Sequence, residues 1–502
     1  MSFIDPKKIL GTIFDEEFGL LLTNFSIKPV HVANGLARAL TSRTYDTSAL
    51  SKTLRPYVRN QKLGVDEERN PNSTILEEYA DAFEPLRGSE PDLKRLTRLR
   101  ALALDVLGAD GAVFDQPNKS SFTLSNERFI THDPSDERTG LFLARLLTAD
   151  PKNQTDAADY IRGLLRSEGD AWTTLALPLL QLGQTREELQ GEGMASCGVK
   201  MEHLFASSDG FLASATLRTL RDAYDRLARF ERKTGSKLNS LRRLMLFGCF
   251  VVHIHVIARW SEREVGAPRP PILLDLFDGT IASVRDASRA TLRAAGDAIE
   301  GLIRMRFREH VMAEYGSNSI EIDQAFASSE ATEHLRSIYE NYRGGGTDAV
   351  EALPRTLVED AFDKVREHPI GAVIELGRRA GFLAPWSNAG RGGKLQKRYT
   401  ATAEFLETLI AATVEPDNPL EFPEFLDRIR SAFGIVVGRP EDDLTIRQNN
   451  LNDGQFGPTT AINEEDLRRN VQEMRELIIE SGYAKAYADG RTIVTTCPEG
   501  RL

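Results

Sequence analysis

The sequence predicts a mainly α-helical protein of more than one domain. Three observations support this fold class: the chain has 502 residues, which is too long for one ordinary core, 41% of them are hydrophobic, and apolar residues recur at helical spacing through most of the second half. Short alternating segments, which are typical of strands, gather mainly in the last hundred residues. We therefore expect a multi-domain helical body followed by a smaller α+β domain.

Breaks in pattern and composition divide the chain into four ranges. Residues 1–150 form a mixed, mostly helical N-terminal region, and residues 151–385 form a helical core domain. Residues 386–399 are a basic, glycine-rich linker, and residues 400–502 are an acidic C-terminal domain. In the core domain we expect helices from Thr155 onward, over 211–233, 240–263 and 281–315, within 316–347, and over 350–366 and 369–380.

The segment from Leu244 to Ala258 is apolar on nearly all sides. It has only 15 residues, whereas a membrane-spanning helix needs roughly 20, and arginines flank both ends. We interpret it as a central helix buried in a core. The three cysteines follow no disulfide or zinc pattern, and the first ten residues lack the apolar run of a signal peptide, so we expect a cytoplasmic protein without membrane contact.

The last hundred residues follow a recognisable order of elements. Helices are predicted over 400–414 and 421–433, a strand over 434–438, a third helix over 463–481, and a hairpin around Asp489-Gly490. This order resembles that of a winged-helix domain. A DNA-reading domain of that family places its third helix in the major groove. Here that helix carries six acidic residues and three arginines, which predicts a protein-interaction or packing domain; DNA contact through Arg468, Arg469, Lys485 and Arg491 stays an alternative.

Charge is strongly segregated along the chain. Residues 401–502 hold 19 acidic and 10 basic residues, whereas residues 211–312 hold 18 basic and 11 acidic ones. Arginines four apart form stripes on the predicted helices, which favours binding of nucleic acid or of an acidic partner; pairing with Asp286, Asp297 and Glu300 is the alternative. The candidate binding residues are Arg218, Arg221, Arg229, Arg232, Arg285, Arg289, Arg293, Arg304 and Arg308.

The linker adds further basic residues on a glycine-rich backbone. Arg391, Lys394, Lys397 and Arg398 are candidate contacts to phosphate, because glycines let backbone amides approach an anion closely. The segment lacks the lysine-serine or lysine-threonine ending of a nucleotide-binding P-loop. We interpret it first as a connection between domains and second as a phosphate contact.

One fragment resembles a catalytic motif. Pro271-Ile-Leu-Leu-Asp-Leu-Phe-Asp-Gly-Thr280 is similar to the first motif of haloacid-dehalogenase-type phosphatases, an apolar strand followed by Asp-x-Asp-Gly-Thr. The resemblance implies Asp275 as nucleophile, Asp278 as acid and base, and a magnesium ion between them. Two residues separate these aspartates here, and in the later acidic motif Arg439 stands where the family has Asp. The alternative is that both aspartates cap the following helix.

The sequence favours neither a metal nor a cofactor. Cys249 and His253 are four residues apart and could share a metal, but no second ligand pair is near in sequence, so a buried, hydrogen-bonded pair is the better interpretation. We assign no catalytic residue. The leading hypothesis is a non-enzymatic adaptor or scaffold subunit of a prokaryotic DNA-handling complex, such as a phage-defence system. A DNA-binding regulator and a magnesium-dependent, phosphatase-like hydrolase using Asp275 and Asp278 are the alternatives.

Overall fold

The protein is mainly helical in the computed structural model, as the sequence predicts. The structure describes residues 5–22, 27–45, 126–127, 130, 134–136, 138–149, 155–167, 188–190, 202–205, 212–264, 267–327, 329, 331–364, 370–384, 397–442 and 463–496. Most of the predicted N-terminal region, 1–150, therefore lies outside the described residues.

The chain forms two compact units that differ from the four expected ranges. Unit 1 comprises residues 1–26, 199–223 and 249–502, and unit 2 comprises residues 27–198 and 224–248. Helices α10 (Ala215–Thr234) and α11 (Lys237–Arg263) contribute residues to both units. The chain on both sides of the expected linker, residues 386–399, belongs to unit 1.

Unit 2 is built on a close crossing of two helices, α2 (Pro29–Thr41) and α6 (Thr139–Thr148). A Cβ atom at Gly140 would lie 2.1 Å from the backbone nitrogen of Leu36, so only glycine permits this approach. The predicted start at Thr155 is confirmed, since its hydroxyl accepts the Ala158 amide at 3.1 Å. This unit also contains the 3-10 turn Pro134–Asp136, α7 (Asp156–Arg166) and the antiparallel pair β1 (Arg43–Tyr45) and β2 (Glu188–Gln190).

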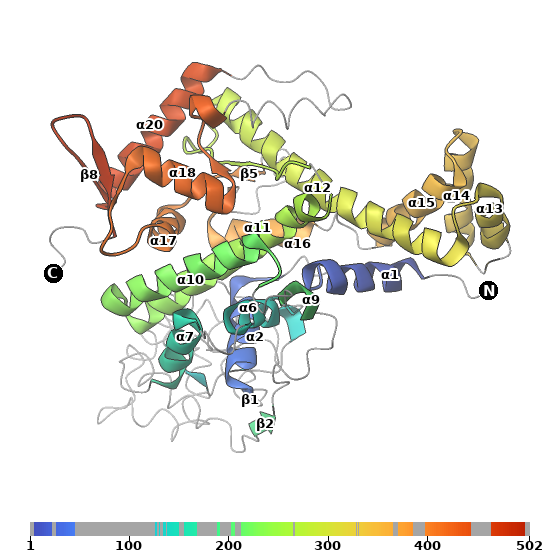
Figure 1. Cartoon of the computed structure of the whole chain (residues 1–502), viewed down its shortest axis with the longest axis horizontal. Coiled ribbons are helices and arrows are strands. Elements are labelled where there is room, and N and C mark those ends of the chain that lie inside the picture. The colour runs from blue at the N-terminus through green and yellow to red at the C-terminus, as the bar shows by residue number, and fades with distance from the viewer. Residues whose placement is uncertain are drawn as a thin grey trace, which may run out of the picture. The chain divides into compact units, whose positions relative to one another are not determined.

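Unit 1 contains a long helix, α12 (Ala282–Tyr315), which the sequence places at 281–315. Figure 1 shows the helices α13 to α15 gathered at one end of α12. The remaining helices before the C-terminal module are α1 (Pro6–Ile13), the π-helical turn Phe14–Phe18, α9 (Glu202–Phe205), α13 (Ser319–Ala327), α14 (Glu333–Gly344), α15 (Ala349–Lys364) and α16 (Ile370–Ala380).

Helix α11 contains the apolar segment singled out in the sequence. Within Asn239–Arg263 the most apolar stretch of 18 residues has a mean hydropathy of 1.6, and 89% of that stretch is buried in the structure. Among the described residues, this is the one helix that is long and apolar enough to span a membrane, and core helices of soluble proteins meet the same two criteria.

Short strands join distant parts of unit 1. Strand β3 (Ile272–Leu273) pairs in parallel with β7 (Ile435–Val436), and β4 (Leu383–Ala384) pairs in antiparallel fashion with β5 (Arg398–Tyr399). Around the first pair, side chains from α12 and from the acidic C-terminal range share one apolar cluster, which consists of Leu273, Val284, Ala287, Val436 and Leu467. The predicted C-terminal domain is therefore packed against the helical body.

The C-terminal module, residues 403–442 and 463–496, has the predicted helices and hairpin. Strand β9 lies between β6 and β8, and the hairpin turns at Gly490, whose φ is +85°. The elements are α17 (Ala403–Thr413), β6 (Leu420–Glu421), α18 (Phe422–Phe433), β7, α20 (Glu464–Glu480), β8 (Ala484–Ala486) and β9 (Thr492–Val494).

Candidate functional site

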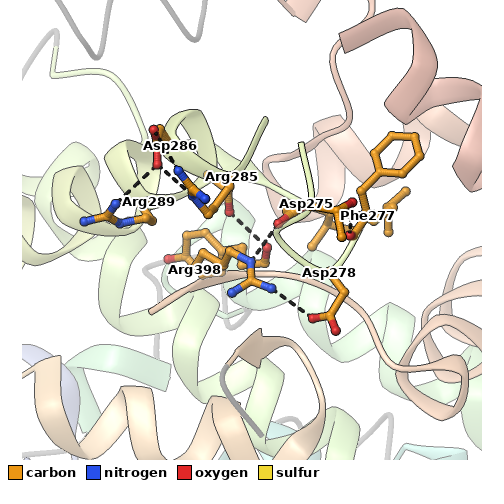
Figure 2. A network of polar contacts seen from close by, with 12 residues as sticks. Asp275, Phe277, Asp278, Arg285, Asp286, Arg289 and Arg398 are labelled. Carbon is orange, nitrogen blue, oxygen red and sulfur yellow. Dashed lines mark hydrogen bonds and ion pairs between the residues drawn. The ribbon is translucent and has the colours of Figure 1, made fainter. Parts of the chain in front are cut away.

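A buried arginine organises the carboxyl end of β3. Arg398 is 5% exposed, and its Nε donates to Asp275 Oδ2 at 2.6 Å while its Nη2 donates to Asp278 Oδ1 at 2.9 Å. Figure 2 shows the guanidinium reaching toward both carboxylates. The two aspartates differ sharply in environment, since the Asp275 side chain is fully buried and that of Asp278 is 77% exposed. The Asp275 contact therefore has the lower local dielectric and the larger energetic consequence.

The backbone around these aspartates is shaped to fit the guanidinium. The Asp275 amide donates to the Tyr399 carbonyl at 3.0 Å, which fixes the loop to β5. Asp278 has a φ of +50°, which is unusual for a residue with a side chain, and Gly279 follows at +79°. A Cβ atom at Gly279 would lie 2.9 Å from Arg398 Nη2. The positive φ and the close approach to the arginine both favour glycine at this position.

This geometry does not fit the phosphatase-like interpretation. Arg398 already supplies the positive charge that a magnesium ion would bring to Asp275 and Asp278, and the remaining Asp275 oxygen accepts the Phe277 amide at 3.1 Å. In the later acidic motif, Asp442 accepts the amides of its own loop, including Arg439 at 3.0 Å, and is 1% exposed. These carboxylates are engaged in holding loops.

The other role predicted for Asp275 and Asp278, capping the following helix, is wrong. Helix α12 begins after Ile281, and no side chain caps its first turn. The reason is distance along the chain: the loop closes on Arg398 before the helix begins. The sequence gives no local signal for a partner that lies 123 residues away from Asp275.

Asn470 joins the two parallel strands beside this network. Its Nδ2 donates to the carbonyls of Leu274 at 2.8 Å and Val437 at 3.0 Å, and its Oδ1 accepts the Leu276 amide at 3.1 Å. Asn470 is fully buried on α20. One amide therefore satisfies backbone groups that the end of both strands leaves unpaired. Sequence reasoning missed this residue, because a single Asn in a charged helix looks like a solvent-exposed position.

The first arginine stripe on α12 is partly neutralised. Arg285 Nε donates to Asp286 Oδ1 at 3.0 Å, and Arg289 Nη1 reaches the same oxygen at 3.2 Å; Figure 2 shows both side chains directed to this carboxylate. The hydrogen bond from Arg285 is the main cause that lowers the pKa of Asp286. Arg293 is exposed. The alternative of internal pairing is thus realised for Arg285 and Arg289.

The other stripe arginines also have partners. Arg304 contacts Glu300 at 2.5 Å, and Arg308 lies 3.9 Å from Glu351. The four candidates on α10 are similarly engaged. Arg218 Nη1 donates to the Leu212 carbonyl at 2.8 Å, Arg221 is 7% exposed, and in unit 2 Arg229 and Arg232 each lie 3.7 Å from the Asp156 carboxylate.

The basic linker is only partly described. Lys397 is half-buried, whereas Arg391 and Lys394 lie outside the described residues. The prediction that Arg398 is a phosphate contact on a flexible linker differs from the structure, in which Arg398 is a buried residue of β5. Arg398 is buried because the Asp275 carboxylate is buried, and a buried carboxylate needs a cation as partner.

The two central histidines are buried and hydrogen-bonded. His253 Nε2 lies 2.8 Å from the Tyr399 hydroxyl, and His255 Nε2 lies 3.1 Å from the Phe18 carbonyl. Burial, with a smaller contribution from the positive charge of Arg269, lowers the pKa of His253 to about 3, and burial with the charge of Arg259 lowers that of His255 to about 4. Within the described residues no group of three His, Cys, Asp or Glu side chains is arranged to hold a metal ion.

Comparison with known proteins gives no relative: no family model, no curated protein and no solved structure matches this chain.

Proposed function

We propose that this chain is a non-enzymatic adaptor or scaffold subunit that engages a partner protein through its C-terminal module. The observation that carries the proposal is the sheet order β6-β9-β8, set beside α17, α18 and α20. A winged-helix domain has the same succession, in which the last strand of the hairpin lies between the other two. A place in a prokaryotic DNA-handling complex, including phage defence, rests on analogy of fold alone.

The surface of α20 favours a protein over DNA. Its buried side carries Leu467, Met474 and Ile478, so the opposite side faces outward. That exposed side holds four glutamates, which would be repelled by phosphates in a groove, together with two arginines. The exposed charged residues are Glu464, Glu465, Arg468, Arg469, Glu476 and Glu480. The density of negative charge on this helix also appears in the pKa of Glu473, which is raised by burial first and then by the charges of Glu476 and Glu480.

The arginine geometry supports the same choice. A protein that tracks a phosphate backbone presents arginines whose charge is available to the nucleic acid. Arg285, Arg289 and Arg304 contact carboxylates, and Arg398 is buried between two of them. Direct binding of nucleic acid is therefore the weaker proposal for this surface.

The test is purification of the tagged chain from its host with nuclease, followed by the same purification of the Glu476→Lys, Glu480→Lys double variant. We expect a stoichiometric protein partner that survives nuclease and is lost with the double variant. Lysine near the end of a helix is favourable for the helix itself, so folding is preserved.

The matched control carries the same charge change far from this surface, at exposed Glu314 and Glu340 on α12 and α14. It should retain the partner. A second purification omits the nuclease. If wild type then elutes with nucleic acid and without a protein partner, and the Arg285→Glu, Arg289→Glu, Arg293→Glu triple variant abolishes that association, the adaptor proposal is overturned in favour of nucleic-acid binding.

A further inference from the structure

The N-terminal segment, residues 5–22, belongs to unit 1 and consists of α1, the π-helical turn Phe14–Phe18 and a short non-helical stretch. Asp5 caps α1 by accepting the Lys7 amide at 3.0 Å, and Pro6 occupies the first turn. Its buried face contacts α12 and α15, beside which Figure 1 shows it lying. That face consists of Ile9, Leu10, Ile13, Phe14 and Phe18. The following chain, from residue 27 on, belongs to unit 2, so this segment is held by contacts distant in sequence.

A glutamate in the π-helical turn is gripped by three arginines. Glu17 is 3% exposed, and its carboxylate lies 3.0 Å from Arg259 Nη2, 3.0 Å from Arg263 Nη2 and 2.9 Å from Arg306 Nε. The neighbouring Glu16 lies 2.8 Å from Arg306 Nη2. The three arginines come from α11 and α12. They form a positively charged cluster that complements the two acidic side chains of Glu16 and Glu17.

Charge is decisive for this attachment. Ordering the backbone of a short segment costs about as much as burial of its apolar side chains returns, so the two large contributions nearly cancel. Three guanidinium groups around a buried carboxylate then determine whether the segment stays bound, because removing one member of a buried ion pair leaves the others uncompensated. The Glu17 carboxylate therefore holds the segment together with its buried apolar side chains and the contact of the Phe18 carbonyl with His255.

We infer that the surface formed by Arg259, Arg263 and Arg306, together with the parts of α12 and α15 that contact α1, is a docking site for an acidic amphipathic helix. The chain's own residues 5–22 fill it in this structure and show the chemistry that it accepts. A partner helix with adjacent acidic residues and a similar apolar face takes their place. This inference rests on the proposed adaptor function in one respect, since it describes the kind of partner that the adaptor receives.

The experiment uses the full chain with a protease site inserted between Leu22 and Ile27. After cleavage, a labelled peptide of residues 5–22 is added as the probe, and its binding is followed by fluorescence anisotropy. We expect the peptide to exchange with the cleaved segment, faster at high salt. The Glu17→Gln peptide should bind at least about tenfold more weakly. A Lys8→Gln peptide, altered on the exposed side of α1, is the matched control and should bind as the unmodified one does.

Two results would overturn the inference: no exchange at any salt concentration, or equal binding of the Glu17→Gln and unmodified peptides. Amide hydrogen exchange of the uncleaved chain gives a second readout, in which residues 5–22 should exchange faster than α12, and faster still in the Glu17→Gln protein. No partner is needed in either measurement. Failure here therefore leaves the adaptor proposal standing, and absence of a partner in the purification leaves this docking site standing.

Discussion

The same residue type has two different roles in unit 1. At the end of β3, Arg398 is buried and bridges Asp275 and Asp278, whereas on α12 Arg285 and Arg289 share Asp286 at a partly exposed surface. Both sets are ion pairs of similar length. Their energetic weight differs because water screens the second set and is excluded from the first. Burial, and not the count of arginines, decides which region holds the fold together.

The largest effect should follow from removing the buried cation. Arg398→Gln leaves Asp275 buried without a charge partner and should lower the free energy of unfolding by about 3–5 kcal/mol. Chemical denaturation followed by circular dichroism measures this change. Arg428→Gln, which removes an exposed pair with Glu424 on α18, is the control and should cost under about 1 kcal/mol. Equal losses in the two variants would remove the contrast.

The two carboxylates that share Arg398 should differ in how much each contributes to the free energy of unfolding. Asp275→Asn removes the buried partner and should destabilise by about 3 kcal/mol or more, whereas Asp278→Asn removes a largely exposed one and should cost under about 1 kcal/mol. Denaturation of the pair under identical conditions tests this. The same variants examine the phosphatase-like alternative, because magnesium-dependent phosphatase activity that Asp275→Asn abolishes would contradict the adaptor proposal.

The two buried histidines of α11, His253 and His255, should make the stability of the protein depend on pH. The pKa values of His253 and His255 lie near 3 and 4 in the folded chain, below the ordinary value of 6.5. Between the lowered pKa values and pH 6.5, the unfolded chain binds more protons than the folded chain. The contribution of the neutral histidines to stability is therefore fully present above pH 6.5 and falls as pH decreases. Each histidine contributes a slope of up to about 1.4 kcal/mol per pH unit. Unfolding free energies at pH 7 and pH 5 measure the slope, and His253→Asn should reduce it relative to wild type.

The smallest effect belongs to the α12 stripe. Arg285→Gln with Arg289→Gln breaks two contacts to Asp286 and should change stability by less than about 1 kcal/mol, since the side chains are 35% and 28% exposed. Loss of the pairs also lets the pKa of Asp286 rise toward its ordinary value, which carboxyl NMR titration detects. A loss of several kcal/mol would show that this surface is as important to the fold as Arg398.

Local patterns in the sequence predicted much of the fold. Helices α10, α11, α12, α18 and α20, and the hairpin around Gly490, lie within a few residues of their expected bounds. Each depends on periodicity, capping or turn residues that act over a few positions. The winged-helix-like arrangement and its acidic third helix remain a prediction drawn from the same patterns.

Only the tertiary structure decided which distant residues meet. Strand β3 pairs in parallel with β7, and Arg398 is buried against Asp275; both contacts join segments more than a hundred residues apart. Asn470 on α20 bonds to the ends of both strands and so packs this helix against them. The docking of Glu17 among three arginines is of the same kind. A linear sequence records the charge and polarity of each side chain. It does not record whether water is excluded around that side chain, and exclusion of water gives these contacts their strength.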